Sequence, residues 1–123
     1  MIKMVFTVRR RPGMSREDFW RYWYDSHGPL VRSHAEALRV RRYVQTHPLQ
    51  DEVNALLARG RGSEPEQYDG VAELWWDSLE DFRAAAATPE GRAAAAALLA
   101  DERTFIDLPS SPLWLGEERV VVD

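Results

Sequence analysis

The chain opens with Ile2-Lys3-Met4-Val5-Phe6-Thr7-Val8, in which apolar side chains recur at every second position from Ile2. Because successive side chains of a strand point to opposite faces, this spacing predicts a β-strand with one face in the core. Arg11-Pro12-Gly13 ends the strand, and Ser15 follows as the predicted N-cap of a helix. The chain therefore begins with a strand and a helix.

The helix after Ser15 is predicted to contain a kink. Phe19, Trp23 and Val31 recur at helical spacing, but Gly28-Pro29 interrupts the run. Proline disfavours helical geometry in the residue before it and has no N–H to donate, so we expect a break at this point. Proline is well suited to the start of a helix, and a second helical piece is expected to follow it.

Periodicity and turn residues assign the remaining elements. Strands are predicted over residues 40–47, 71–76 and 113–122, helices over 53–58, 79–87 and 88–105, and a loop over 60–70. Apart from the short helix, the order is strand, helix, strand, strand, helix, strand. Right-handed crossovers convert that order into a single α+β domain over residues 1–123, with a four-stranded antiparallel sheet and helices on one face only.

The other face of this sheet would remain uncovered. We expect it to carry Tyr43, Trp75 and parts of the last strand. Because an exposed aromatic patch of this size is unusual on a monomer, the sequence predicts a homodimer formed through the open sheet face.

Composition restricts the partners of the protein. A net charge of −4 argues against general binding to nucleic acid or to an anionic membrane surface. The basic cluster at Arg9-Arg10-Arg11 is interpreted as a solvated face. No apolar run approaches the roughly 18 residues of a membrane span, and no signal peptide is evident. The absence of cysteine excludes disulfides and thiolate chemistry and fits a cytoplasmic location.

Several blocks of the sequence, in order, resemble proteins of the EthD-domain family. They are Arg10-Arg11-Pro12-Gly13-Met14-Ser15, Ser26-His27-Gly28-Pro29-Leu30-Val31, Arg42-Tyr43-Val44-Gln45, Asp69-Gly70-Val71-Ala72-Glu73-Leu74-Trp75 and Thr88-Pro89-Glu90-Gly91. The resemblance covers nearly the whole chain. It implies a ferredoxin-like subunit that dimerises into an α+β barrel, with a cavity between sheet and helices.

The resemblance does not choose an activity. Related barrels include muconolactone isomerases, polyketide cyclases and dehydratases, quinone-forming monooxygenases and accessory proteins of ether degradation. Fold analogy cannot decide among these functions, so the candidate residues have to be weighed one by one.

Two histidines are the candidate catalytic residues. His27 lies on the helical stripe of Phe19 and Trp23, and is either a buried ring bonded to the turn or an acid–base group at a cavity. His47 ends a strand on the same side as Tyr43 and Gln45; it either orients a substrate or faces solvent.

The candidate substrate-binding residues are Tyr43, Gln45, Glu73 and Trp75. Tyr43 and Trp75 would form aromatic walls or belong to the core and interface. Glu73 would pair with Lys3 or an arginine across the sheet, or stand in the cavity. No role is assigned to the carboxylates near the end of the last helix.

The sequence predicts no metal and no cofactor. The histidines lack metal-ligand spacing, and there is neither a phosphate-binding loop nor a nucleophile elbow. The leading hypothesis is a cofactor-independent enzyme, an isomerase, dehydratase, cyclase or monooxygenase, that transfers protons on a small hydrophobic or aromatic molecule. The alternatives are a non-catalytic binding or accessory protein and a structural dimer with a filled cavity.

Overall fold

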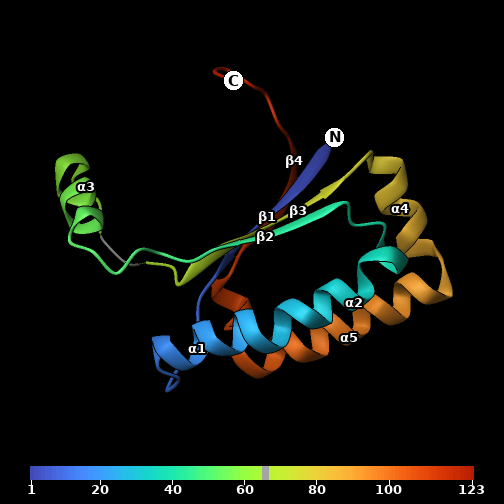
Figure 1. The fold of residues 1–123 in the computed structure, drawn as a ribbon, viewed down its shortest axis with the longest axis horizontal. Helices are drawn as coiled ribbons and strands as arrows, with labels where there is room; N and C mark the ends of the chain where they lie inside the picture. The colour runs from blue at the N-terminus through green and yellow to red at the C-terminus, as the bar shows by residue number, and fades with distance from the viewer. Residues whose placement is uncertain (65–66) are drawn as a thin grey trace.

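The computed structural model, which describes residues 1–64 and 67–123, contains a four-stranded antiparallel sheet (Figure 1). The strands are β1 (Ile2–Val8), β2 (Arg42–Thr46), β3 (Gly70–Trp76) and β4 (Leu113–Glu117). They lie in the order β2-β3-β1-β4. The predicted α+β class and its four-stranded antiparallel sheet are confirmed.

The helical segments are α1 (Arg16–Tyr22), the π-helical η1 (Trp23–His27), α2 (Gly28–Leu38), α3 (Val53–Arg61), α4 (Leu79–Ala87), α5 (Pro89–Phe105) and the 3₁₀ turn η2 (Leu108–Ser110). Apart from α3, the main helices form a second layer on one side of the sheet (Figure 1). Of these, α2 and α5 pack side by side under the sheet, whereas α3 lies apart at the end of β2. Within the described residues, no helix is long and apolar enough to cross a membrane.

The helical run changes type at Gly28-Pro29, where the π-helical η1 meets α2, and the predicted second helical piece begins there. Gly28 has right-handed helical geometry, with φ −54° and ψ −52°, and the chain passes from α1 through η1 into α2 without a break. One wide π-helical turn precedes Pro29. Such a turn can absorb the clash that a proline ring otherwise makes with the preceding helical carbonyls.

The last strand is shorter than the predicted 113–122. Ile2, the first residue of β1, pairs with Glu117, so residues after Glu117 have no strand beside them. The helix predicted over 53–58 extends to Arg61. Its last residues are therefore helical, although they fall in the loop predicted over 60–70. Residues 65 and 66 of that loop lie outside the described residues.

The strand register separates the two faces of the sheet. Tyr43 pairs with Leu74 and therefore points to the helices, whereas Trp75 pairs with Lys3 and points to the open face. The expectation that Tyr43 and Trp75 share one face is wrong. The error follows from the period of two, because a one-residue difference in register moves a side chain across the sheet.

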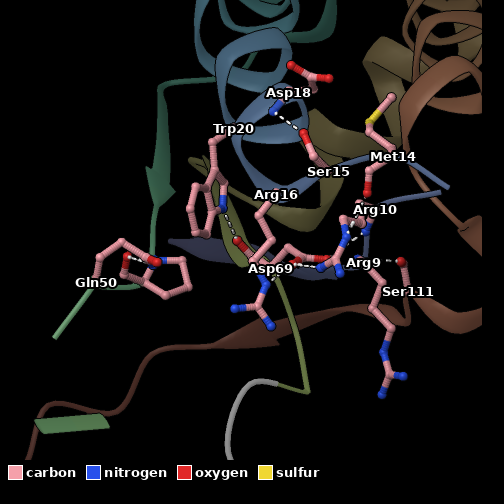
Figure 2. Close-up of polar contacts among 11 residues, drawn as sticks. Arg9, Arg10, Met14, Ser15, Arg16, Asp18, Trp20, Gln50, Asp69 and Ser111 are labelled. Atoms are coloured by element: carbon pink, nitrogen blue, oxygen red, sulfur yellow. Dashed lines mark hydrogen bonds and ion pairs between the residues drawn. The ribbon is translucent and has the colours of Figure 1, made fainter. Parts of the chain in front are cut away.

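A buried aspartate ties the end of β1 to the start of β3 (Figure 2). The Asp69 carboxylate accepts the Arg10 backbone N–H at 2.8 Å and the Arg10 guanidinium at 2.6 Å. Its carbonyl oxygen accepts the Trp20 indole N–H at 2.8 Å. Arg9 lies over the Tyr68 ring, at 4.5 Å from the centroid. The arginine cluster is therefore partly structural, not the simple solvated face that its charge predicts.

The aromatic core joins the helices to the start of β3. The rings of Phe19 and Phe105 lie 5.5 Å apart, and those of Phe19 and Trp23 lie 5.6 Å apart. A Cβ at Gly70 would come within 2.5 Å of the Trp23 ring. Gly70 therefore allows Trp23, and with it η1, to lie directly on the sheet.

Candidate functional site

A cavity of about 280 Å³ lies between the helix-facing side of the sheet and the helices. Most of its wall is apolar, including Phe6, Trp23, Val31, Leu74, Trp76, Phe82 and Leu98. Three ionisable side chains join this lining, namely His27, Tyr43 and Glu102. Apolar walls with a few convergent polar groups are the usual composition of a small-molecule site.

His27 is buried and held by a carboxylate. Its side chain comes from η1, and its Nδ1 lies 2.7 Å from Oδ2 of Asp101 on α5. The Tyr22 hydroxyl donates to the other oxygen, Oδ1, of the same carboxylate. Because an ionised carboxylate only accepts hydrogen bonds, we assign the proton of His27 to Nδ1 and the lone pair to Nε2.

The surroundings of His27 favour the neutral ring. Burial lowers the pKa of His27 below its ordinary value, and the hydrogen bond to Asp101 and the charge of Asp101 oppose this only in part. The ring also packs against Phe105, with centroids 5.0 Å apart. None of the described residues hydrogen-bonds to Nε2. His27 therefore places a neutral imidazole ring at the cavity wall.

Glu102 is a second titratable group of the cavity. No hydrogen bond or ion pair reaches its carboxyl group from the described residues. Burial raises the pKa of Glu102 to about 7, and the charge of neighbouring Asp101 adds to the effect. Burial also raises the pKa of Tyr43 to about 12, so its hydroxyl stays protonated at neutral pH.

Gln45 and His47 lie at a different place. They line a surface groove with Tyr24, Pro29 and Arg32, not the cavity. The Gln45 amide donates to the Trp23 carbonyl at 2.8 Å and to the Tyr43 hydroxyl at 2.9 Å. His47 Nε2 lies 2.8 Å from the Gln45 amide oxygen. The His47 ring stacks on Trp23 at 4.5 Å.

Glu73 and Trp75 lie on the open face of the sheet, away from the cavity. Glu73 pairs with Lys3 at 2.6 Å, which is the pairing considered from the sequence. The Trp75 ring is flanked by Lys3 at 5.3 Å and by Arg42 at 4.9 Å. Its indole N–H donates to Glu118. Of the predicted site residues, the structure therefore brings only His27 and Tyr43 together at the cavity.

The inward placement of Asp101 and Glu102 was not predicted from the sequence. Both fall between Leu98 and Phe105, two buried positions of α5 that lie two helical turns apart. Residues three and four positions from a buried one share its side of a helix. That spacing was the available signal that these carboxylates face inward. Within residues 1–64 and 67–123, no three His, Asp or Glu side chains gather as a metal site.

These features define an α+β protein with a ferredoxin-like sheet and a mostly apolar cavity bordered by a buried His–Asp pair. The sequence model of the EthD domain matches residues 11–109. The chain belongs to the EthD-domain family. No curated protein matches the sequence at a significant level.

Solved structures share the fold at low sequence identity. An EthD family protein from Bacillus halodurans C-125 is 19% identical, with a TM-score of 0.62 over 97% of this chain and 100% of the other. A mutant of SnoaB, a cofactor-independent oxygenase from Streptomyces nogalater, is 16% identical, with a TM-score of 0.57 over 98% and 95%. A dimeric ferredoxin-like protein of unknown function from Thermobifida fusca YX is 16% identical, with a TM-score of 0.56 over 94% and 88%.

Proposed function

We propose that this EthD-domain protein is a cofactor-independent enzyme that transfers protons on a small hydrophobic molecule in the cavity. The observation that carries the proposal is the His27–Asp101 pair at the wall of this apolar space, with Nδ1 and Oδ2 2.7 Å apart. A ring whose tautomer is fixed by a carboxylate can present its other nitrogen as a base.

In this mechanism His27 Nε2 removes a proton from the bound molecule. The carboxylate of Asp101 holds the ring in one orientation and stabilises the imidazolium that forms. Isomerisation, dehydration and cyclisation require only such proton transfers, whereas oxygenation of an electron-rich ring also consumes dioxygen. The likeness to SnoaB supports a reaction without a cofactor, because its fold supports one there.

Tyr43 would complete the wall of the site, and Gln45 would act through it. Gln45 holds both the Tyr43 hydroxyl and the Trp23 carbonyl, so it fixes two residues of the cavity without lining it. His47 in turn bonds to Gln45. We therefore assign positioning roles to Gln45 and His47.

A non-catalytic binding or accessory protein is the second candidate. The largely apolar lining favours it, because such walls would retain a hydrophobic metabolite without any chemistry at His27. Turnover separates the two functions. A bound molecule that is released unchanged would support the carrier.

The test starts from a molecule that co-purifies with the protein, identified by native mass spectrometry. His27→Asn should keep binding it, while its conversion falls by roughly 10²–10⁴, because asparagine hydrogen-bonds but does not carry protons at neutral pH. The matched control is His34→Asn, a change of a partly exposed histidine on α2 outside the cavity.

Two results would contradict the assignment of His27. Unchanged turnover in His27→Asn would leave a purely structural histidine. If His27→Ala and His27→Asn both unfold, as judged by circular dichroism, the ring is an anchor of the core.

A further inference from the structure

Glu102 places a carboxyl group inside an otherwise apolar part of the cavity. It follows Leu98 by one turn of α5 and lines the same cavity as His27 and Tyr43. None of the described residues donates a hydrogen bond to its side chain. Removal from water disfavours the ionised form of such a carboxyl group, so a large neutral fraction persists up to a pH of about 7.

We infer that Glu102 is the acid of the cavity, donating a hydrogen bond to a carbonyl oxygen of the substrate, so that the site takes uncharged carbonyl compounds and rejects carboxylates. This inference rests on the proposed function and names the substrate class for it. It also assigns a role to the Glu102 carboxyl group, which takes no part in the hydrogen bond between His27 and Asp101.

The charges around Glu102 support the selection against anions. Asp101, next to it on α5, bears the negative charge that accepts from His27 and Tyr22. His27 from η1 is neutral, and Tyr43 from β2 keeps its proton. The described lining residues include no lysine or arginine. A bound carboxylate would therefore find no cation and would be repelled by Asp101.

The pair of Glu102 and His27 permits a balanced reaction. The C–H bond next to the substrate carbonyl breaks, its proton moves to His27 Nε2, and its electron pair forms a carbon–carbon double bond. The carbonyl oxygen takes the proton of Glu102 and becomes an enol. In a substrate with a further carbon–carbon double bond next to this position, the enol is a conjugated dienol. It takes the proton of His27 at the far end of that double bond, while its O–H proton returns to Glu102. The double bond has then moved and both residues are restored, with no oxidant or reductant required.

The test compares two probes that share one ring system, 2-acetylnaphthalene, an uncharged ketone, and 2-naphthoate, a carboxylate. Both are of the size that roughly 280 Å³ admits. Binding is followed by quenching of tryptophan fluorescence from pH 6 to 8.5. We expect the ketone to bind at least about tenfold more tightly than naphthoate at pH 6, and to lose about tenfold as Glu102 ionises.

Two variants test whether Glu102 is the group that causes the pH dependence of ketone binding. Glu102→Gln keeps a donor but does not titrate, so its ketone affinity should not change over this pH range. Glu90→Gln, the same substitution at an exposed position of α5, should behave as the wild type. Carbon-13 NMR of labelled glutamate supplies a readout without any ligand, with an expected midpoint near 7 for Glu102.

The possible results separate the role of Glu102 from the proposed ligand site and from the role of His27. Equal affinity for the two probes, a pH-independent ketone affinity in the wild type, or an NMR midpoint near the ordinary value of 4.5 would overturn the inference about Glu102 and leave His27 as a candidate base. Failure of both probes to bind would remove the proposed ligand site as well. Ketone selectivity without effect of His27→Asn on turnover would retain Glu102 and remove only the base.

Discussion

Replacing Glu102, a residue of the proposed site, is expected to stabilise the folded protein at high pH. A carboxyl group whose pKa is raised on folding, here from 4.5 to about 7, stabilises the fold fully below pH 4.5 and loses that contribution as the pH rises through 7. Glu102→Gln should therefore increase the free energy of unfolding at pH 8.5 by up to about 3 kcal/mol relative to the wild type.

Below pH 4.5 the same substitution should change stability little, since the wild-type residue is then protonated in both states. Urea denaturation near pH 4 and near pH 8.5 measures the difference. An equal effect of Glu102→Gln at both pH values would show that the carboxyl group is not shifted by its surroundings. A gain at high pH would be consistent with a residue retained for activity at the expense of stability.

At the residue scale, His27 could be singled out from the sequence, but the carboxylate that contacts it could not. His27 stands out because histidine is rare here and falls on an apolar stripe. Asp101 is 74 residues away, and only the packing of η1 on α5 brings its carboxylate to the ring. Tyr43 and Trp75 show the reverse error, since the pattern alone could not fix their register in the sheet.

At the scale of elements, the contact between β3 and η1 depends on Gly70. Gly70→Ala would place a Cβ 2.5 Å from the Trp23 ring and 2.9 Å from the Thr46 carbonyl oxygen. We expect a loss of about 1–3 kcal/mol in the free energy of unfolding, measured by urea denaturation, because a packed core yields little to added volume.

Gly60→Ala is the matched control for this prediction. A Cβ at Gly60 meets nothing within 4 Å, and the residue lies within α3. Alanine there should stabilise the protein by about 0.5–1 kcal/mol through its higher helix propensity. Two equal effects would mean that the Gly70–Trp23 contact is not important for stability.

Helix starts were predictable, whereas the π-helical turn before Pro29 was not. Ser15, Ser78 and Thr88 each accept the backbone N–H three residues on, as their positions before helical runs predict. The π-helical turn before Pro29 is also contacted by a distant residue. Gln45 donates to the Trp23 carbonyl from 22 residues away, so no local rule could reveal it.

At the scale of the whole molecule, we expect a homodimer through the open sheet face. This face carries Val5, Val44, Val71, Trp75 and Trp114. Trp114 is 53% exposed in the single chain. Burying such a face against an identical one is the commonest solution for a one-sided sheet.

Trp114→Glu tests this expectation, because it places a carboxylate within the proposed interface. Sedimentation at micromolar concentration should show a dimer for the wild type and a smaller species for the variant, with circular dichroism reporting on folding. Leu79→Glu, on α4 and 40% exposed, should remain dimeric. A folded wild-type monomer at this concentration would be decisive against the dimer.

The alternation of side chains in β3 also has a consequence for how such a protein can diversify. Ala72, Leu74 and Trp76 line the cavity, whereas the intervening Val71, Glu73 and Trp75 face the opposite side of the sheet. With a ligand in the cavity and the proposed dimer on the open face, alternate positions of this one strand would govern ligand choice and self-association. A mutational library restricted to positions 72, 74 and 76 would explore new ligands on an unchanged assembly surface. A library restricted to 71, 73 and 75 would explore new assemblies around an unchanged cavity.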